Sequence, residues 1–118
     1  MSKKTGDWGE QIAVRFLNSM GVHILHQNWR SGHCELDIVG IEGNTLIFYE
    51  VKVRKYDSPT DMFDAIGVDQ MRTLAKAASD YMQIYELEGE VRFDLIGITY
   101  YDKTNYTIDH KMDVFFPA

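Results

Sequence analysis

Cysteine is almost absent from this 118-residue sequence, which contains Cys34 alone. A single cysteine excludes an internal disulfide and is typical of proteins kept in a reducing compartment. The sequence also lacks any run of about eighteen apolar residues, so no segment is expected to span a membrane. Its first residues include two lysines without an apolar stretch after them, which argues against a secretory signal peptide. We therefore expect a cytoplasmic protein that does not enter membranes.

Positive charge is also in short supply. Lysine and arginine number 12 against 18 aspartates and glutamates, which gives a formal net charge of −6. Proteins that coat nucleic acid or bind acidic membrane surfaces need broad positive fields, so this balance argues against both classes. The net charge does not exclude enzymes that act on nucleic acid. Their catalytic metal site is itself acidic, and a local rim of basic residues is enough to bind the substrate.

The sequence does contain a regular succession of helix and strand patterns along one expected domain, residues 1–118. Asp7–Met20 has apolar residues at three- and four-residue spacing and predicts a helix with Asp7 as its N-cap. A short strand, VHIL, and a polar loop, HQNWRSGH, follow it. Later patterns predict a hairpin at Glu35–Arg54, a loop or short helix at Lys55–Gly67, a helix from Asp69, its N-cap, to about Tyr85, and strands at Val91–Tyr100 and Tyr106–His110.

This order indicates an α/β domain with a mixed sheet. A helix that crosses between two strands of one sheet joins strands that run parallel, whereas hairpins join antiparallel strands. We expect helices to cover the sheet, in an αβββαβ core followed by a C-terminal strand.

The hairpin carries charged residues where core residues are expected. Gly43-Asn44 predicts a two-residue turn, which fixes the partner of every residue in the two strands. Asp37 then lies opposite Glu50, and Glu35 lies opposite Lys52. Because side chains alternate between faces along a strand, all four share one face at the open end of the hairpin. Two opposed carboxylates repel each other, so one should have a raised pKa unless a cation lies between them.

Both faces of this hairpin are otherwise apolar, which predicts that it is covered on both sides. Buried acids cost free energy unless they bind something, and Mg²⁺ (or Mn²⁺) takes carboxylate, water and phosphate oxygens as ligands. We therefore predict a metal site at Asp37 and Glu50, where Lys52 orients an attacking water or neutralises a developing phosphorane. The apolar residues are Val39, Ile41, Leu46 and Phe48 on the charged face, and Leu36, Ile38, Ile47, Tyr49, Val51 and Val53 on the other.

A structural alternative stays open for the same residues. Glu35 and Lys52 would then form a cross-strand salt bridge, while Asp37 and Glu50 would point into water. The metal-site prediction depends on the register, because a slip of one residue moves the charges of one strand to the other face.

These residues resemble the YraN-like family, a bacterial group within the PD-(D/E)xK restriction-endonuclease-like nucleases. The resemblance runs from about Thr5 to Phe115. Two positions depart from the family pattern, because Cys34 replaces a glycine and Asp69 replaces a lysine that would contact phosphate. The matching motifs are Gly6-Asp7 with Glu10, Glu35-Leu36-Asp37-Ile38-Val39, Phe48-Tyr49-Glu50-Val51-Lys52-Val53-Arg54, Gln70, and Arg92-Phe93-Asp94-Leu95.

The resemblance implies a nuclease fold similar to archaeal Holliday-junction resolvases and a metal-dependent endonuclease acting on branched or otherwise irregular DNA. The net charge and Asp69 predict that the protein binds DNA weakly or in a structure-specific way. Nucleases that grip a junction often work as two-fold pairs, so a homodimer is expected. The rival hypothesis is a non-catalytic module that keeps this fold and binds nucleic acid or protein. A small-molecule binder is disfavoured, because no glycine-rich phosphate loop follows any strand.

Further candidates surround the predicted metal site. Glu10 either forms a capping box with Asp7 or, as the resemblance implies, reaches the metal or its water. Glu35 would assist beside the metal, and Gln70, near the start of the second long helix, would support a metal ligand.

Three basic residues are candidates for contacting nucleic acid. Arg54 and Lys55 extend the second strand of the hairpin beyond the predicted site, and Arg30 lies in the preceding loop. Together they would form a phosphate-contacting rim, or otherwise a solvated, charged strand end.

Overall fold

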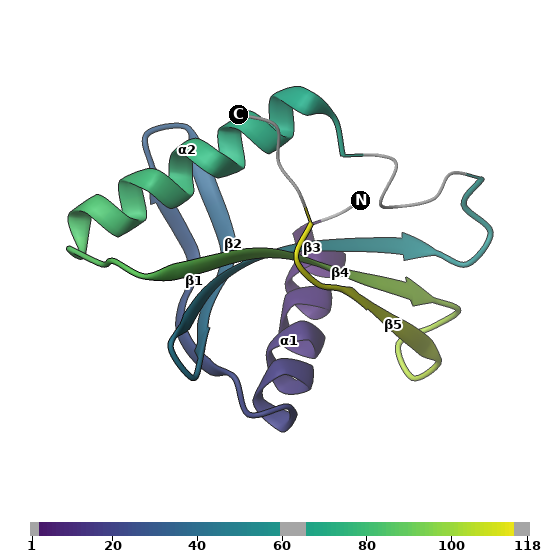
Figure 1. The fold of residues 1–118 in the computed structure, drawn as a ribbon. Coiled ribbons are helices and arrows are strands. Elements are labelled where there is room, and N and C mark those ends of the chain that lie inside the picture. Colours follow the sequence, from purple (N-terminus) through teal and green to yellow (C-terminus); the bar gives the residue numbers. More distant parts are fainter. Residues whose placement is uncertain (1–2, 60–65, 115–118) are drawn as a thin grey trace.

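A five-stranded sheet with a helix on each face forms the framework of the described residues, 3–59 and 66–114 of a computed structural model (Figure 1). The strands lie in chain order, and only β3 and β4 run parallel, because α2 crosses between them. The predicted α/β class and order of elements are therefore confirmed. The elements are α1 (Lys3–Ser19), β1 (His23–Ser31), β2 (Cys34–Glu42), β3 (Thr45–Lys55), α2 (Val68–Ile84), β4 (Glu90–Tyr100) and β5 (Tyr106–Lys111).

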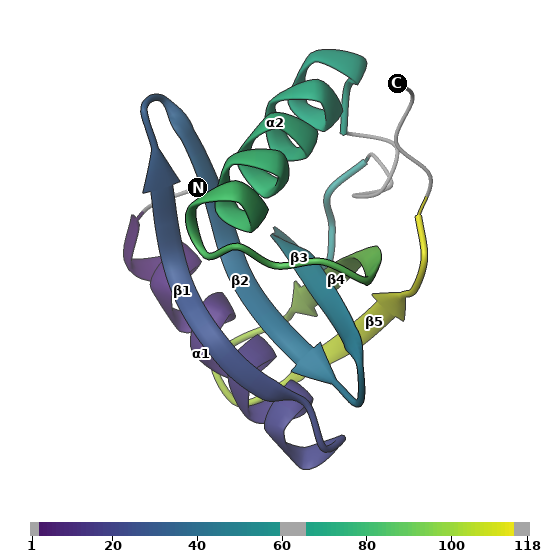
Figure 2. The ribbon, with the colours of Figure 1, turned by 60° about the vertical axis from the view of Figure 1, so that its left-hand side comes forward.

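Helix α1 covers one face of the sheet (Figure 2). It begins at Lys3, so Asp7 lies inside the helix and the predicted N-cap at Asp7 is wrong. The apolar spacing that predicts this helix starts only after its first turn and therefore marks the beginning too late. The apolar residues between α1 and the sheet, the α1 cluster, are Ile12, Ala13, Leu17, Val22, Ile38, Ile47, Tyr49, Val51, Ile96 and Ile98.

Helix α2 covers the opposite face. It begins at Val68 after Gly67, which occupies the N-cap position without a side-chain hydrogen bond, so Asp69 is a first-turn residue and not the predicted cap. The small residues Ala77 and Ala78 are buried and let the helix approach the sheet closely. The residues packed between α2 and the sheet, the α2 cluster, are Leu36, Val39, Leu46, Phe48, Leu74, Ala77, Ala78 and Tyr81.

Strand β1 is longer than its apolar pattern indicates. The predicted polar loop HQNWRSGH is mostly strand, because β1 continues to Ser31 and turns back at Gly32, which has a φ of +60°. His26 and Trp29 pack their rings against Tyr81 of α2, with centroids 5.4 and 5.1 Å apart. This tertiary packing stabilises a strand in a segment whose polar composition favours a loop.

The predicted register of the central hairpin is confirmed over its closed end. Thr45 pairs with Glu42, and the antiparallel ladder continues to the pair Ile38–Tyr49. Gly43 has a φ of +60° in the connecting turn, as a type II′ turn requires at its first central residue.

Two further expectations concern regions around this framework. Neither helix within residues 3–59 and 66–114 is long and apolar enough to cross a membrane. Part of the predicted loop or short helix at 55–67, namely residues 60–65, lies outside the described residues.

Candidate functional site

Strands β2 and β3 separate where the charged residues begin. Their ladder ends at Ile38–Tyr49, so the predicted pair Asp37–Glu50 is not part of it. Beyond the ladder, the side chain of Asp37 replaces a backbone carbonyl as acceptor: its Oδ2 accepts a hydrogen bond of 2.9 Å from the N–H of Val51. Asp37 therefore lies in the seam between the two strands and bridges them through its side chain.

The alternation of side chains is interrupted at the same place. Leu36 packs in the α2 cluster, whereas Ile38 packs in the α1 cluster, so the prediction that both share one face is wrong. Across the β1–β2 ladder, Gln27 pairs with Ile38 and Trp29 with Leu36, which leaves Asn28 facing Asp37.

Asn28 explains how the backbone accommodates this interruption. It has a φ of +52°, a left-handed conformation that asparagine tolerates better than most residues. Sequence reasoning missed Asn28, since it lies in a segment read as a loop. Its only signal was the residue type itself, which favours left-handed backbone.

Glu50 is held from two sides in the middle of β3. Its side chain is on the α2 side of the sheet and the residue is 8% exposed. Oε1 of Glu50 accepts a 2.9 Å hydrogen bond from Nε2 of Gln70 and lies 3.3 Å from Nζ of Lys52. Gln70 is in the first turn of α2, so the placement of this helix fixes the orientation of the carboxyl group.

Asp37 and Glu50 hydrogen-bond to each other through their carboxyl groups. Burial, with the negative charge of Asp37 second, raises the pKa of Glu50 to about 8, although Lys52 opposes the shift. Burial also raises the pKa of Asp37, while the Val51 N–H opposes it. Two buried carboxyl groups in contact therefore keep a proton between them near neutral pH.

Glu10 approaches Asp37 of this pair from α1. Burial and then the charge of Asp37 raise the pKa of Glu10 to about 7, while a hydrogen bond with Asn28 opposes the shift. The capping-box interpretation of Glu10 is wrong, because α1 begins at Lys3 and places Glu10 well inside the helix. The structure thus gathers Glu10 and the Asp37–Glu50 pair around the separated strands.

The remaining predicted residues are distributed around this centre. Arg30 forms an ion pair with Glu35, with Nη2 and Oε2 3.1 Å apart, and the charge of Glu35 acts on both Asp37 and Glu10. The alternative Glu35–Lys52 salt bridge is not formed within the described residues, since Lys52 pairs with Glu50.

The other two predicted basic residues lie toward the end of β3. Arg54 is half-buried, with its Nε 3.5 Å from Oγ1 of Thr99 across the parallel ladder. Lys55 is exposed at the last position of the strand. The structure therefore places Arg30 apart from these two residues, on β1, where it pairs with Glu35.

The donor set suits a hard divalent cation that keeps water and substrate ligands. Within residues 3–59 and 66–114, no group of three His, Cys, Asp or Glu side chains is already arranged to hold a metal ion. Mg²⁺ needs fewer, since one or two carboxylates plus waters and phosphate oxygens commonly complete its six ligands. Asp37 and Glu50 supply two carboxylates, and a bound cation would relieve the repulsion that appears when their shared proton is lost.

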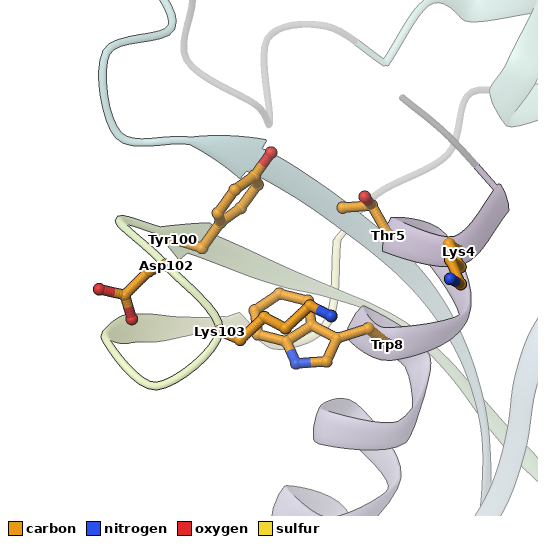
Figure 3. A pocket seen from close by; sticks show the side chains of 6 residues that line it. All are labelled: Lys4, Thr5, Trp8, Tyr100, Asp102 and Lys103. Atoms are coloured by element: carbon orange, nitrogen blue, oxygen red, sulfur yellow. The ribbon is translucent and has the colours of Figure 1, made fainter.

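A pocket of the described residues lies elsewhere, at the N-terminal end of α1. It has a volume of about 410 Å³ and includes none of the predicted site residues (Figure 3). The carboxyl pair, with its raised pKa values, therefore lies outside this cavity. The pocket is lined by Lys4, Thr5, Trp8, Tyr100, Asp102 and Lys103.

Fold and site together define a mixed α/β domain in which two buried carboxyl groups and a lysine meet where two strands separate. The chain belongs to the uncharacterised protein family UPF0102, whose family model matches residues 9–98. This range contains Glu10, Asp37, Glu50, Lys52 and Gln70, so the complete candidate site falls within the family match.

Relatives with the same family name cover nearly the whole chain. A UPF0102 protein of Bacteroides fragilis is 40% identical over 116 residues, which span 95% of this chain and 92% of that protein. One from Bacteroides thetaiotaomicron is 37% identical over 112 residues, 95% of this chain and 92% of the relative. A third, from Chlorobium chlorochromatii, is 34% identical over 116 residues, 94% of this chain and 90% of the relative.

Proposed function

We propose that this protein is a Mg²⁺-dependent endonuclease that hydrolyses phosphodiester bonds in DNA, with branched or otherwise irregular DNA as its substrate. One observation carries the proposal: the carboxyl groups of Asp37 and Glu50 hydrogen-bond to each other in the seam between β2 and β3, with Nζ of Lys52 3.3 Å from Oε1 of Glu50. Two acids in contact inside a fold cost free energy, whereas a bound divalent cation uses both as ligands.

The order of the elements supports the same class. An acid on β2, a Glu-x-Lys sequence on β3 and an assisting helix before them match what the YraN-like, restriction-endonuclease-like resemblance implies. The described parallel pairing of β3 with β4 places the Glu-x-Lys strand in the middle of the sheet, where its side chains are held rigidly. Rigid placement favours catalysis, because the reacting groups need no reordering at the moment of reaction.

Asp37 and Glu50 would hold Mg²⁺ or Mn²⁺, which would supply positive charge at the scissile phosphate and lower the pKa of a bound water. Gln70 would keep the Glu50 carboxylate in its orientation through the 2.9 Å hydrogen bond. The Val51 N–H would do the same for Asp37. These supporting contacts exist before substrate arrives, which is the usual arrangement around metal ligands.

Lys52 and Glu10 would act on the attacking water. The water oxygen would form a bond to phosphorus in line with the leaving oxygen, whose bond to phosphorus breaks. Glu10, with a pKa of about 7, is suited to accept the proton of that water near neutral pH. Lys52 would orient the water and stabilise the charge that spreads over the phosphate oxygens. The departing oxygen would take a proton from solvent.

A second candidate function is a non-catalytic module that binds nucleic acid or protein. One observation favours it: Oε1 of Glu50 is already satisfied by Gln70 and Lys52, so this carboxyl group has partners without a metal. The net charge of −6 points the same way. Under this alternative, Asp37 and Glu50 would remain protonated partners and would not bind divalent metal.

Calorimetric titration with Mg²⁺ and Mn²⁺ separates the two candidates. The wild type and Lys76→Ala, a change at an exposed residue on the outer surface of α2, should both bind metal. Asp37→Asn should abolish binding. If wild type and Asp37→Asn bound metal equally, the proposed metal site would be wrong and the non-catalytic module would be the remaining candidate.

A nuclease screen then tests the reaction itself. Blunt duplex, flap, four-way junction and RNA substrates would be incubated with Mg²⁺ and wild type, Lys52→Ala or Lys76→Ala. We expect cleavage of a branched substrate by wild type and Lys76→Ala and none by Lys52→Ala. Cleavage that survives in Lys52→Ala would indicate a contaminating nuclease.

A further inference from the structure

Two tyrosines lie stacked on the surface where β3 and β4 end. The ring centroids of Tyr56 and Tyr101 are 4.5 Å apart, and their planes differ by 15°. The two residues are 51% and 58% exposed, so the pair is not a part of the core. Most aromatic contacts in the described residues are tilted or edge-on and lie partly inside the protein, and large exposed apolar groups that gather in this way commonly mark a binding surface.

This tyrosine pair lies on the same face of the sheet as Glu50. Side chains alternate along β3, which places Glu50, Lys52 and Arg54 on the α2 side. The N–H of Tyr56 donates a 2.9 Å hydrogen bond to the carbonyl of Tyr100, so Tyr56 extends the same alternation by one more position. The six residue-to-residue steps of extended chain from Glu50 to Tyr56 span roughly 20 Å.

The neighbour of Tyr101 supports this placement. The ring of Tyr100 lies 5.8 Å from that of Trp8 on α1, so Tyr100 points to the α1 side. Tyr101, the next residue, accordingly points to the α2 side, where it meets Tyr56. Its backbone N–H is fixed by a 2.8 Å hydrogen bond to the carbonyl of Asn105 in the β4–β5 turn. The tyrosine pair is therefore held by two strand ends and not by a free loop.

Basic residues lie between the carboxyl pair and the tyrosine pair. Lys52 and Arg54 share the face, whereas Lys55, exposed at the strand end, alternates to the α1 side. The carboxylate of Asp102, next to Tyr101, is turned into its own loop, where it accepts hydrogen bonds from the backbone N–H groups of Thr104 and Asn105. The path from Glu50 to the tyrosine pair thus offers cations for phosphates and, at its end, flat rings for bases.

We propose that the tyrosine pair, Tyr56 and Tyr101, is a platform on which unpaired bases of a DNA substrate stack. Proteins that bind single strands combine a basic path along the backbone with aromatic rings under the bases. A continuous duplex covers its base faces by its own stacking, so the pair would select DNA with an unpaired segment. The position of the scissile phosphate at Asp37 and Glu50 rests on the proposed function, whereas the stacking contact does not.

Fluorescence anisotropy without divalent metal, so that no cleavage takes place, tests the platform. The probes are a labelled blunt duplex and the same duplex with a single-stranded thymidine tail. Wild type should bind the tailed probe more tightly. Tyr56→Ala and Tyr101→Ala should each weaken that binding about 5- to 150-fold, the range for loss of one base–aromatic stack, and leave blunt-duplex binding unchanged.

Two further variants keep the test decisive. Tyr56→Phe retains the ring and should bind the tailed probe like wild type, and Tyr85→Ala removes an exposed tyrosine at the far end of α2 and should do the same. Thermal unfolding followed by circular dichroism verifies that each variant is folded. Equal affinity of wild type, Tyr56→Ala and Tyr101→Ala for the tailed probe would overturn the inference.

The outcomes separate this inference from the proposed function. If tail binding depends on the tyrosine pair but no substrate is ever cleaved, the platform stands and the nuclease proposal fails. If DNA is cleaved but the tyrosines have no effect on tail binding, the nuclease stands and the platform fails. If sedimentation finds a dimer that Tyr56→Ala converts to a monomer, the pair is a contact between copies and the inference is overturned.

Discussion

Gln70 donates a hydrogen bond of 2.9 Å to Oε1 of Glu50, which joins the first turn of α2 to the centre of β3. The glutamine amide donates to the carboxyl oxygen that also lies 3.3 Å from Lys52. A neutral donor of fixed geometry restrains Glu50 without cancelling its charge. The helix therefore positions a candidate metal ligand across about twenty residues of chain.

Gln70→Ala is expected to weaken Mg²⁺ binding about 10- to 100-fold, the usual range for losing a group that orients a metal ligand. The free energy of unfolding should change little, because Gln70 is only partly buried. Gln83→Ala, an exposed glutamine at the other end of α2, is the matched control. Isothermal titration calorimetry measures both variants, and equal affinities would contradict the proposed positioning role.

Glu50→Gln is expected to stabilise the metal-free protein at pH 8. The pKa of Glu50 is about 8 in the folded protein against 4.5 when exposed, so the folded state binds this proton more tightly. The free energy of unfolding contributed by Glu50 consequently falls as pH rises from 4.5 to about 8. The variant should be more stable at pH 8 by about 1–3 kcal/mol, because a neutral amide avoids the cost of burying an ionised carboxyl group.

Urea unfolding of wild type and Glu50→Gln across this pH range measures the difference. The advantage of the variant should shrink toward pH 4.5 and disappear below it, where wild-type Glu50 is protonated in both states. If the difference in the free energy of unfolding were the same at all pH values, it would come from packing and not from the ionisation of Glu50.

Asn28 supports Glu10 through a side-chain hydrogen bond and also carries the left-handed backbone opposite Asp37. Asn28→Gly keeps that backbone conformation but removes the hydrogen bond, so the pKa of Glu10 should rise above about 7. Asn28→Ala should in addition lose about 1 kcal/mol of stability, because alanine disfavours a positive φ. Carbon-13 NMR titration of the Glu10 carboxyl group and urea unfolding separate these effects; a Glu10 pKa unchanged in both variants would rule out the contact.

Tyr49→Phe is expected to stabilise the protein. The hydroxyl of Tyr49 is buried and has no hydrogen-bond partner among the described residues. Removing an unsatisfied buried hydroxyl should increase the free energy of unfolding by about 1 kcal/mol. Thermal unfolding of the two proteins measures the change, and a lower stability of Tyr49→Phe would reveal a partner for the hydroxyl, such as bound water.

The closed end of the hairpin and the parallel β3–β4 pairing could be predicted because both follow from local rules. Gly43 in a two-residue turn sets the register of the residues next to it, and a helical crossover sets the direction of β4. Glu50 and Lys52 lie two residues apart on a regular strand, so their shared face also follows from spacing alone.

The open end of the hairpin could not be predicted from spacing, because its geometry depends on contacts distant in sequence. Trp29 and His26 pack on Tyr81 and hold β1 in place, and the left-handed Asn28 between them shifts the alternation. Asp37 consequently enters the seam and bonds to Val51 instead of lying flat opposite Glu50. Likewise, the position of Gln70 at the start of α2 predicts that it lies near the site, but its contact with Glu50 depends on how the helix packs.

Mg²⁺ binding is expected to release about one proton at pH 7 and almost none at pH 9, because both ligands must be ionised to bind the metal. The Asp37–Glu50 pair retains a proton below the Glu50 pKa of about 8, so metal affinity should rise with pH up to that value and then level off. Calorimetry in buffers of different ionisation enthalpy counts the released protons. An observed binding enthalpy at pH 7 that is independent of the buffer would mean that no proton leaves the pair, and the carboxyl groups would then not be the ligands.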